Sequence, residues 1–356
     1  MNRQSVMIAM SGGVDSSVAA WLMARQGYSC LGATMRMCDA SLPNMENAAD
    51  PAVDARAVAE KMDIPFYVFQ ATEEFRRMVI DPFVSVYEAG GTPNPCICCN
   101  HTMKFGYLLE QALDMGCSHI VTGHYAKLRQ DESTGRYLLY KAEDPAKDQS
   151  YFLAGLNQHQ LSHILFPLGE LTKEQVRKIA EEQGFITAKK RDSQDICFIP
   201  DGDFAAFIRA YTQKDYPAGD FLDRNGKVVG KHSGAFAYTL GQRKGLGLAM
   251  GEPVYVCGKD MANNTVTVGS NDSLFASTLV AENWNWLPFP ALDGPIRVMA
   301  KARYRHTAQP ATVYPLEDGK AKVVFDEPQR AITPGQAVVL YEDDMVVGAG
   351  TITTVE

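Results

Sequence analysis

The sequence predicts an α/β fold: an N-terminal Rossmann-like parallel sheet with helices on both faces, then a small central β-rich domain and a C-terminal β-barrel domain. Three observations support this prediction. Strand-like and helix-like segments alternate through the first half of the chain, as in parallel sheets covered by helices. A glycine-rich turn follows the first strand-like segment, at the edge where such sheets bind ligands. After about residue 203, short β-prone runs separated by turn residues dominate, which is typical of small barrels.

The order of the predicted elements divides the chain. In the first half we expect strands at 5–10, 30–35, 66–69 and 119–122, and helices at 16–25, 54–62, 73–87, 105–115 and 172–183. The last helix begins with Thr172-Lys173-Glu174-Gln175, a typical capping sequence. The β-prone runs of the second half are 227–229, 254–257, 265–268, 322–325 and 337–341. The predicted domains are therefore 1–205, 206–275 and 276–356.

The formal charge of the 356-residue chain, -8, does not by itself favour nucleic-acid binding. Phosphates respond to a local basic face and not to the sum over the chain. The candidate basic spots are Lys189-Lys190-Arg191, Arg243-Lys244, and Lys301 with Arg303 and Arg305. The apolar runs are far shorter than a membrane span, and the N-terminus lacks a leader pattern. We therefore expect a cytoplasmic protein without a membrane partner.

The segment Ser11-Gly12-Gly13-Val14-Asp15-Ser16 joins the first predicted strand to the first predicted helix. Paired glycines let backbone N–H groups approach an oxyanion, and the helix directs its positive end toward the same place. Asp15 is a candidate ligand for Mg²⁺ beside the phosphates. A tight turn without a ligand is the weaker alternative. The Gly-Lys-Ser/Thr ending of the kinase and GTPase loop is absent, so the segment predicts a different phosphate-binding loop.

Eight cysteines are present, and four of them need an explanation. Cys96, Cys98 and Cys99 share one proline-rich segment, whereas Cys197 lies far downstream. The prolines favour an extended segment that presents the thiols on a fixed loop. If Asn100 caps the next helix, Cys99 lies near a helix N-terminus, where the thiolate is favoured. Three interpretations remain open from these residues: buried structural thiols, a metal or iron–sulfur site on Cys96, Cys99 and Cys197, and a sulfur-carrying redox pair of Cys99 and Cys197.

The glycine-rich loop resembles the pyrophosphate loop of the N-type ATP pyrophosphatases. This resemblance implies transfer of AMP from ATP to a substrate oxygen, release of pyrophosphate, and a fold like that of the adenine nucleotide α hydrolases. Further motifs in one order are Thr-Pro-Asn-Pro-Cys-x-x-Cys-Asn at 92–100, Thr-Gly-His-Tyr at 122–125, Lys-Asp-Gln-Ser-Tyr-Phe at 147–152, Cys-Phe-Ile at 197–199, Gly-Gln-Arg-Lys-Gly at 241–245, Arg-Tyr-Arg at 303–305 and Pro-Gly-Gln at 334–336. With them, essentially the whole chain resembles the bacterial tRNA-specific 2-thiouridylases, enzymes that place sulfur on C2 of the wobble uridine.

The resemblance implies roles for individual residues. ATP would be held by Ala9, Met10, Ser11, Gly12, Gly13, Val14, Asp15, Ser16, Met35 and Gly123. Cys197 would carry a persulfide whose terminal sulfur displaces AMP from C2. Cys99 would be the nucleophile that releases this sulfur, leaving a transient Cys99–Cys197 disulfide. The tRNA, with its target base taken out of the anticodon stack, would contact Asn94, Pro95, Cys96, His124, Lys147, Asp148, Gln149, Arg303, Tyr304 and Gln336.

One position departs from part of the family. Cys96 stands where some members carry Asp, a residue that can assist proton transfer. Because Cys96 completes Cys-x-x-Cys with Cys99, a [4Fe–4S] cluster on Cys96, Cys99 and Cys197 stays open beside the persulfide route. Two further alternatives are an adenylating enzyme with a small carboxylate or amide substrate, and a non-enzymatic RNA-binding protein whose nucleotide loop is regulatory.

The resemblance also implies cofactors and partners. ATP and Mg²⁺ are the expected cofactors. The expected partners are tRNA, through the anticodon region of Lys-, Glu- and Gln-type acceptors, and a protein that donates persulfide sulfur, with no DNA. The central β-rich domain at 206–275 would bind the tRNA.

Overall fold

The computed structural model describes residues 4–45, 50–188, 190 and 196–356. Two residues of the predicted basic spot at 189–191, Lys189 and Arg191, lie outside the described residues. The described part begins with a five-stranded parallel sheet in the order β3-β2-β1-β4-β7. Its strands are β1 (Ser5–Ala9), β2 (Ser29–Arg36), β3 (Phe66–Gln70), β4 (His119–Val121) and β7 (Ile164–Leu165). The sequence predicted β1, β2, β4 and the edge strand β3, and it missed the two-residue edge strand β7.

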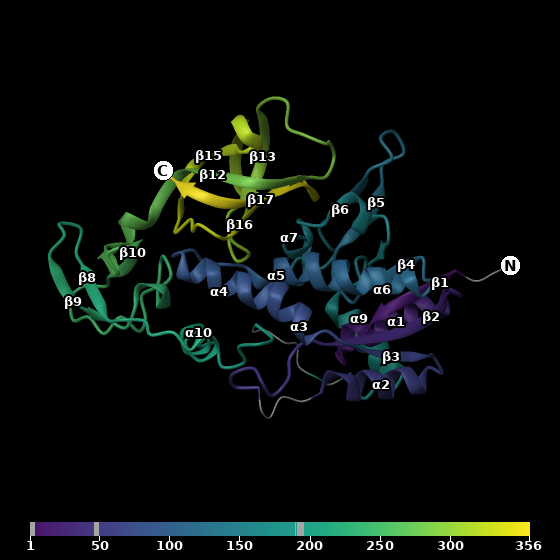
Figure 1. Ribbon diagram of the computed structural model, residues 1–356. Helices are drawn as coiled ribbons and strands as arrows, with labels where there is room; N and C mark the ends of the chain where they lie inside the picture. The colour runs from purple at the N-terminus through teal and green to yellow at the C-terminus, as the bar shows by residue number, and fades with distance from the viewer. Residues whose placement is uncertain (1–3, 46–49, 189, 191–195) are drawn as a thin grey trace.

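Helices cover both faces of this sheet, as the sequence predicts (Figure 1). The apolar residues of β1 alternate: Val6 and Ile8 pack into one core, and Met7 packs into another. The first core is formed with α1 (Val14–Arg25), α2 (Pro51–Lys61) and α9 (Lys173–Glu182). The second is formed with α3 (Thr72–Phe75), η1 (Arg76–Ile80), α4 (Asp81–Glu88), η2 (Asn100–Tyr107), α6 (Leu108–Asp114) and α10 (Phe204–Thr212).

Helix termini follow the local signals in one place and depart from them in another. Thr172 and Gln175 form the predicted capping box at the start of α9. The proline-rich segment, however, is not extended up to Asn100. Asn94 accepts a hydrogen bond from Ile97 N at 3.3 Å and caps a short helix, α5 (Pro95–Cys99), which continues into η2. A proline at the first helical position fits because its missing N–H has no helical partner there.

The second half of the chain forms two β structures. β8 (Gly219–Leu222), β9 (Val228–His232), β10 (Tyr255–Asp260) and β11 (Thr265–Gly269) make a small sheet in the order β10-β11-β8-β9. β12 (Phe275–Trp286), β13 (Ile296–Lys301), β14 (Gln309–Pro315), β15 (Ala321–Arg330), β16 (Ala337–Glu342) and β17 (Met345–Val355) follow, and pairing of β12 with β17 closes them into the predicted barrel.

The barrel sheet also contains strands from the first half of the chain, which the sequence did not predict. The hairpin β5 (Lys127–Gln130) and β6 (Tyr137–Tyr140) adds to it through β17, where Met345 pairs with Tyr140. Short helices α7 (Ser150–Leu153) and α8 (Gln158–Leu161) follow the hairpin. The domain ranges 1–205, 206–275 and 276–356 stay predictions. Within the described residues, the helices are too short or too polar to cross a membrane.

Candidate active site

The glycine-rich loop lies between β1 and α1, where its backbone approaches a neighbouring helix closely. Gly12 has a φ of +67°, and a Cβ there would lie 2.9 Å from the carbonyl oxygen of Pro51, so only glycine fits. The hydroxyls of the loop shape it internally: Ser16 Oγ and Ser17 Oγ donate to Gly13 O at 3.2 and 2.9 Å. The positive end of α1 therefore points at a tightly turned loop, as an anion site requires.

A cavity of about 250 Å³ opens beside this loop, at the carboxyl ends of β1, β2 and β4. Gly123, which follows β4, makes this possible: a Cβ would lie 2.7 Å from Asp15 C and from Ser16 N. The cavity is lined by Ala9, Met10, Ser11, Asp15, Ser16, Ala33, Thr34, Met35, Met37, Pro51, Lys104, Leu108, Thr122, Gly123, His124 and Gln149. The predicted nucleotide residues thus meet in one place, with Gly12, Gly13 and Val14 forming the adjoining turn.

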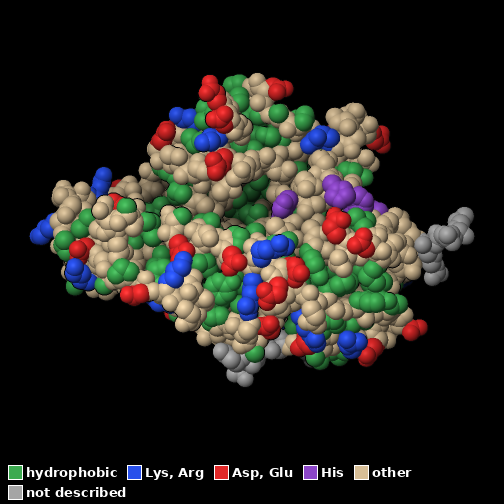
Figure 2. Space-filling view, in the orientation of Figure 1, with side chains coloured by type: hydrophobic (Ala, Val, Ile, Leu, Met, Phe, Trp, Pro, Cys, Tyr) green, Lys and Arg blue, Asp and Glu red, His purple; other side chains and the backbone are tan. Residues whose placement is uncertain are grey.

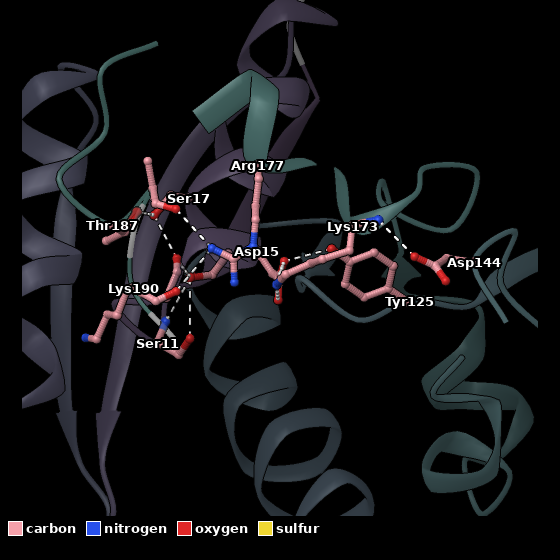
Figure 3. A network of polar contacts seen from close by, with 12 residues as sticks. Ser11, Asp15, Ser17, Tyr125, Asp144, Lys173, Arg177, Thr187 and Lys190 are labelled. Carbon is pink, nitrogen blue, oxygen red and sulfur yellow. Dashed lines mark hydrogen bonds and ion pairs between the residues drawn. The ribbon is translucent and has the colours of Figure 1, made fainter. Parts of the chain in front are cut away.

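Asp15, which lines the cavity, is the centre of a polar network (Figure 3). Both of its carboxylate oxygens accept from Lys173 Nζ, at 2.7 and 2.8 Å, and Tyr125 Oη donates to one of them at 2.8 Å. Asp144 accepts from the backbone N of Lys173 at 3.0 Å and fixes the start of α9. The predicted Mg²⁺ ligand is therefore engaged by a lysine, and the residues as placed do not fit the metal ion.

A further cation, Lys190, reaches the loop from the segment after α9, which the sequence did not connect with the loop. Lys190 Nζ donates to Gly12 O at 2.9 Å and pairs with Asp54 at 2.7 Å. Thr187 and Ser17 share a hydroxyl hydrogen bond of 3.0 Å, and Arg177 donates to Ala188 O at 3.1 Å. The run of basic residues at 189–191 was the available signal, and it was interpreted only as a surface feature.

The cysteines predicted to act together lie near one another beside the cavity. Cys99 is buried, Cys96 and Cys197 are exposed, and the charge of Cys197 acts on both of the others. Burial raises the pKa of Cys99 to about 12, and Lys104 partly opposes this shift. Burial also raises the pKa of Cys96. The neighbouring Cys38, followed by desolvation of the thiol by the surrounding protein, raises the pKa of Cys197 well above its usual value.

The expectation that Cys99 sits near a helix N-terminus with a favoured thiolate was therefore wrong. Cys99 is the last residue of α5, whose N-cap is Asn94, so the positive helix end lies a turn away. Desolvation then dominates the pKa of the thiol. Either a cation or a conformational change has to favour the thiolate before it reacts.

Lys104 is the cation best placed for this, and the sequence reading did not single it out. It lies on η2, lines the cavity, and its Nζ is 3.4 Å from His124 Nε2. The positive charge lowers the pKa of Cys96, Cys99 and Cys197, whereas desolvation of these thiols raises it. Lys104 lies five residues after Cys99 in the sequence. This spacing did not mark it as a neighbour of the thiol, because a π-helical turn was not expected there.

His124 is buried and neutral. Burial first, and then Lys104, hold its pKa well below the usual range. Its Nδ1 lies 2.8 Å from Thr122 Oγ1, which fixes the ring between the cavity and η2. The side chain therefore offers a hydrogen bond and not a charge at the cavity wall.

The four thiols do not form a metal-binding set as they stand. Among the described residues, no three His, Cys, Asp or Glu side chains lie close enough together to hold a metal ion. The cluster alternative on Cys96, Cys99 and Cys197 thus has no preformed ligand set in this geometry, and it stays a prediction.

Several residues predicted to contact tRNA support the protein itself. Gln336 Nε2 donates to Thr92 O at 2.8 Å and to Pro93 O at 3.0 Å, which ties the barrel to the cysteine segment. Arg303 donates to Leu240 O at 3.1 Å and to Thr333. These contacts join the barrel to the segment before α5 and to the small sheet region.

The remaining residues of that set lie around α7. Asp148 accepts from Ser150 Oγ at 2.8 Å and from Ala142 N at 3.1 Å, so it stabilises the start of the helix. Gln149 Oε1 accepts from Tyr125 N at 3.0 Å while lining the cavity. Tyr304 packs on Phe152 with ring centroids 4.3 Å apart. Figure 2 shows the molecule hollowed between the barrel above and the first-half helices below.

The fold and the site together define an ATP-pyrophosphate-loop protein: a parallel sheet, a Ser-Gly-Gly-x-Asp-Ser turn at the carboxyl end of its first strand, and a nucleotide-sized cavity beside it. Three family models match the chain. They are the tRNA methyl transferase HUP domain at residues 4–201, the tRNA methyl transferase PRC-barrel domain at 205–270 and the aminomethyltransferase beta-barrel domain at 276–352.

Curated relatives identify the family of the chain within this class of proteins. The tRNA-specific 2-thiouridylase MnmA of Clostridioides difficile is 47% identical over 99% of this chain and 98% of its own length. Those of Acetivibrio thermocellus and Geotalea uraniireducens are each 48% identical, over 99% and 98% of this chain and 100% and 95% of their own lengths. The chain belongs to the MnmA family of tRNA-specific 2-thiouridylases, which confirms the family that the ordered motifs predict.

Proposed function

We propose that this protein uses ATP to replace the C2 oxygen of the wobble uridine of tRNA with sulfur. The observation that carries the proposal is the position of the cavity: the phosphate loop forms one end of it, and Lys104 and His124, beside the cysteine pair, form the other. The names of the curated relatives, tRNA-specific 2-thiouridylases, support the same substrate and reaction.

ATP would bind with its pyrophosphate on the loop. The backbone of the segment 11–16 and the N-terminus of α1 would hold the phosphates, and Lys173, Arg177 and Lys190 would supply positive charge around them. The adenosine would lie against the apolar cavity wall that includes Met35, with Gly123 leaving room beside the loop. Mg²⁺ would need a carboxylate that is at present paired with Lys173, so we assign it no residue.

The oxygen of the uridine then becomes a leaving group. O2 attacks the α-phosphate, and pyrophosphate leaves, so that C2 carries an AMP ester. The terminal sulfur of a persulfide on Cys197 attacks C2, and AMP leaves. The Cys99 thiolate attacks Sγ of Cys197, the sulfur–sulfur bond breaks toward the base, and 2-thiouridine and a Cys99–Cys197 disulfide result. Because burial raises the pKa of Cys99, the charge of Lys104 favours the thiolate that this step needs.

The tRNA would approach across the hollow between the barrel and the first-half helices. Direct contacts with the base are proposed for Asn94, Pro95 and Cys96, and contacts elsewhere on the tRNA for His124, Lys147, Asp148, Gln149, Arg303 and Tyr304. For Gln336 we propose a supporting role, since its amide holds the cysteine segment through Thr92 and Pro93. A persulfide-donor protein, acceptors of the Lys, Glu and Gln types and a cytoplasmic location complete the proposal.

A tRNA thiolation assay tests the function. Purified protein is incubated with ATP, a small persulfide and a transcript that carries the wobble uridine, and thiolated RNA is separated on a gel that retards thiocarbonyl groups. We expect product with the wild type and with Cys98→Ser, and loss of product with Cys99→Ala and Cys197→Ala. Pyrophosphate release without tRNA, or full activity of both alanine variants, would refute the proposed reaction. Iron and sulfide analysis of anaerobically purified protein tests the cluster alternative.

A further inference from the structure

Two segments that are distant in sequence pack together beside Cys197. One follows β2, and the other contains Cys197. Asn44 Nδ2 of the first donates to Asp201 Oδ2 of the second at 2.9 Å. Leu42 and Met45 are buried in the same core cluster as Phe198 and Ile199, which directly follow Cys197. The segment after β2 is therefore a fixed neighbour of the persulfide-bearing residue.

This packing brings a second thiol to Cys197. Cys38 comes two residues after the end of β2, packs on the same core as Ile196, and lies close enough to Cys197 to raise the pKa of that thiol. Both thiols are free, Cys197 is exposed and Cys38 is half-buried. Cys99, in contrast, is only 8% exposed. The three thiols thus differ in how easily a reductant from solution reaches them.

We propose that Cys38 resolves the Cys99–Cys197 disulfide after each turnover; this inference rests on the proposed sulfur transfer. The Cys38 thiolate attacks Sγ of Cys197, a Cys38–Cys197 bond forms, the Cys99–Cys197 bond breaks, and Cys99 leaves as a thiolate that takes up a proton. This exchange leaves the number of disulfides unchanged. A dithiol reductant from solution then reduces the Cys38–Cys197 pair and itself becomes a disulfide.

The reason for a third thiol is access. Thiol–disulfide exchange requires the attacking sulfur to approach along the axis of the disulfide, and a buried sulfur shields one end of that axis. Moving the bond from Cys99 to Cys38 brings it from a buried position to the surface segment after β2, without changing its partner Cys197. Cys99 is then free for the next cycle before the external reductant acts.

Mapping of disulfides during turnover tests the inference. The full-length protein is given tRNA transcript, ATP, glutathione persulfide and a thioredoxin-type dithiol protein, then quenched in acid, alkylated and analysed by mass spectrometry. Wild type and Cys98→Ser are expected to contain the Cys38–Cys197 disulfide. Cys38→Ser is expected to accumulate Cys99–Cys197, with later turnovers about tenfold slower relative to the first. Cys98 is the matched control because its Sγ donates to Met78 O at 3.0 Å, away from Cys197.

The outcomes separate this inference from the proposed function. Wild type that thiolates tRNA but contains only Cys99–Cys197, or no disulfide of Cys197, overturns the role of Cys38 and leaves the function intact. Equal turnover of Cys38→Ser and Cys98→Ser overturns it in the same way. Wild type that makes no thiolated tRNA overturns both. If Cys38→Ser does not fold, as judged by circular dichroism, the wild-type disulfide map still decides.

Discussion

Removal of the Lys173 ammonium should measure how strongly the polar network holds the phosphate loop. Lys173 Nζ donates to both oxygens of Asp15, at 2.7 and 2.8 Å, and the two side chains are 11% and 29% exposed. A surface pair contributes about 0–1 kcal/mol, whereas breaking a fully buried pair costs about 3–5 kcal/mol. Because water reaches Asp15 in part, and Tyr125 still donates to it, we expect Lys173→Met to lower the free energy of unfolding by about 2 kcal/mol.

A double-mutant cycle isolates this interaction from other effects of the substitution. Lys173→Met, Asp15→Asn and the double variant are unfolded in urea, followed by tryptophan fluorescence, with ATP affinity measured by calorimetry. Lys178→Met is the control, since Lys178 is exposed on the same helix, and it should change stability by less than about 0.5 kcal/mol. A coupling free energy below about 0.5 kcal/mol between positions 15 and 173 would show that the network does not hold the loop.

Four further predictions concern the cavity and the cysteine segment. Gly123→Ala should abolish ATP binding in calorimetry with the fold retained, because the new Cβ would lie 2.7 Å from backbone of Asp15; unchanged affinity would contradict the close approach. Alkylation of Cys99 by iodoacetamide should rise about tenfold per pH unit from pH 7 to 9.5, since its pKa is raised to about 12 and the thiolate fraction grows throughout; a plateau near pH 9 would contradict this. Lys104→Met should slow the alkylation of Cys99 at each pH, because loss of the cation raises the pKa of the thiol further. Gln336→Ala should increase proteolytic cleavage in the cysteine segment and reduce thiolation, because it removes the hydrogen bond that Gln336 donates to Thr92 O.

Local sequence signals predicted the central part of the first sheet well. The apolar run of β1 reflects burial on both faces of the strand, whereas the apolar spacing of α9 reflects one buried face, and both patterns can be recognised within a short stretch of sequence. The edge strand β7 and the hairpin β5–β6 gave weaker signals. The hairpin is stabilised by pairing of Tyr140 with Met345 from the end of the chain, which no local window contains.

The phosphate loop was the most local part of the candidate site. Gly12 needs a positive φ, and the hydroxyls of Ser16 and Ser17 bond within the same turn, so the sequence of the loop specifies its own shape. Its cationic surroundings were not local. Lys173 and Lys190 reach it from α9 and the segment after it, more than 150 residues along the chain, and their side chains could be assigned only after packing brought α9 against α1.

The cysteines show which properties of the site the sequence could predict and which it could not. By itself, the sequence determined that Cys99 and Cys197 belong to motifs of one family, because the order of the motifs and the type of each residue are recognised without a structure. The tertiary structure alone decided that Cys99 is buried with a raised pKa, that Lys104 lies close enough to lower the pKa of the thiols, and that Cys38 lies beside Cys197. The physical reason is that desolvation and charge act through space: they depend on which segments fold against a sulfur atom and not on the residues next to it in the chain.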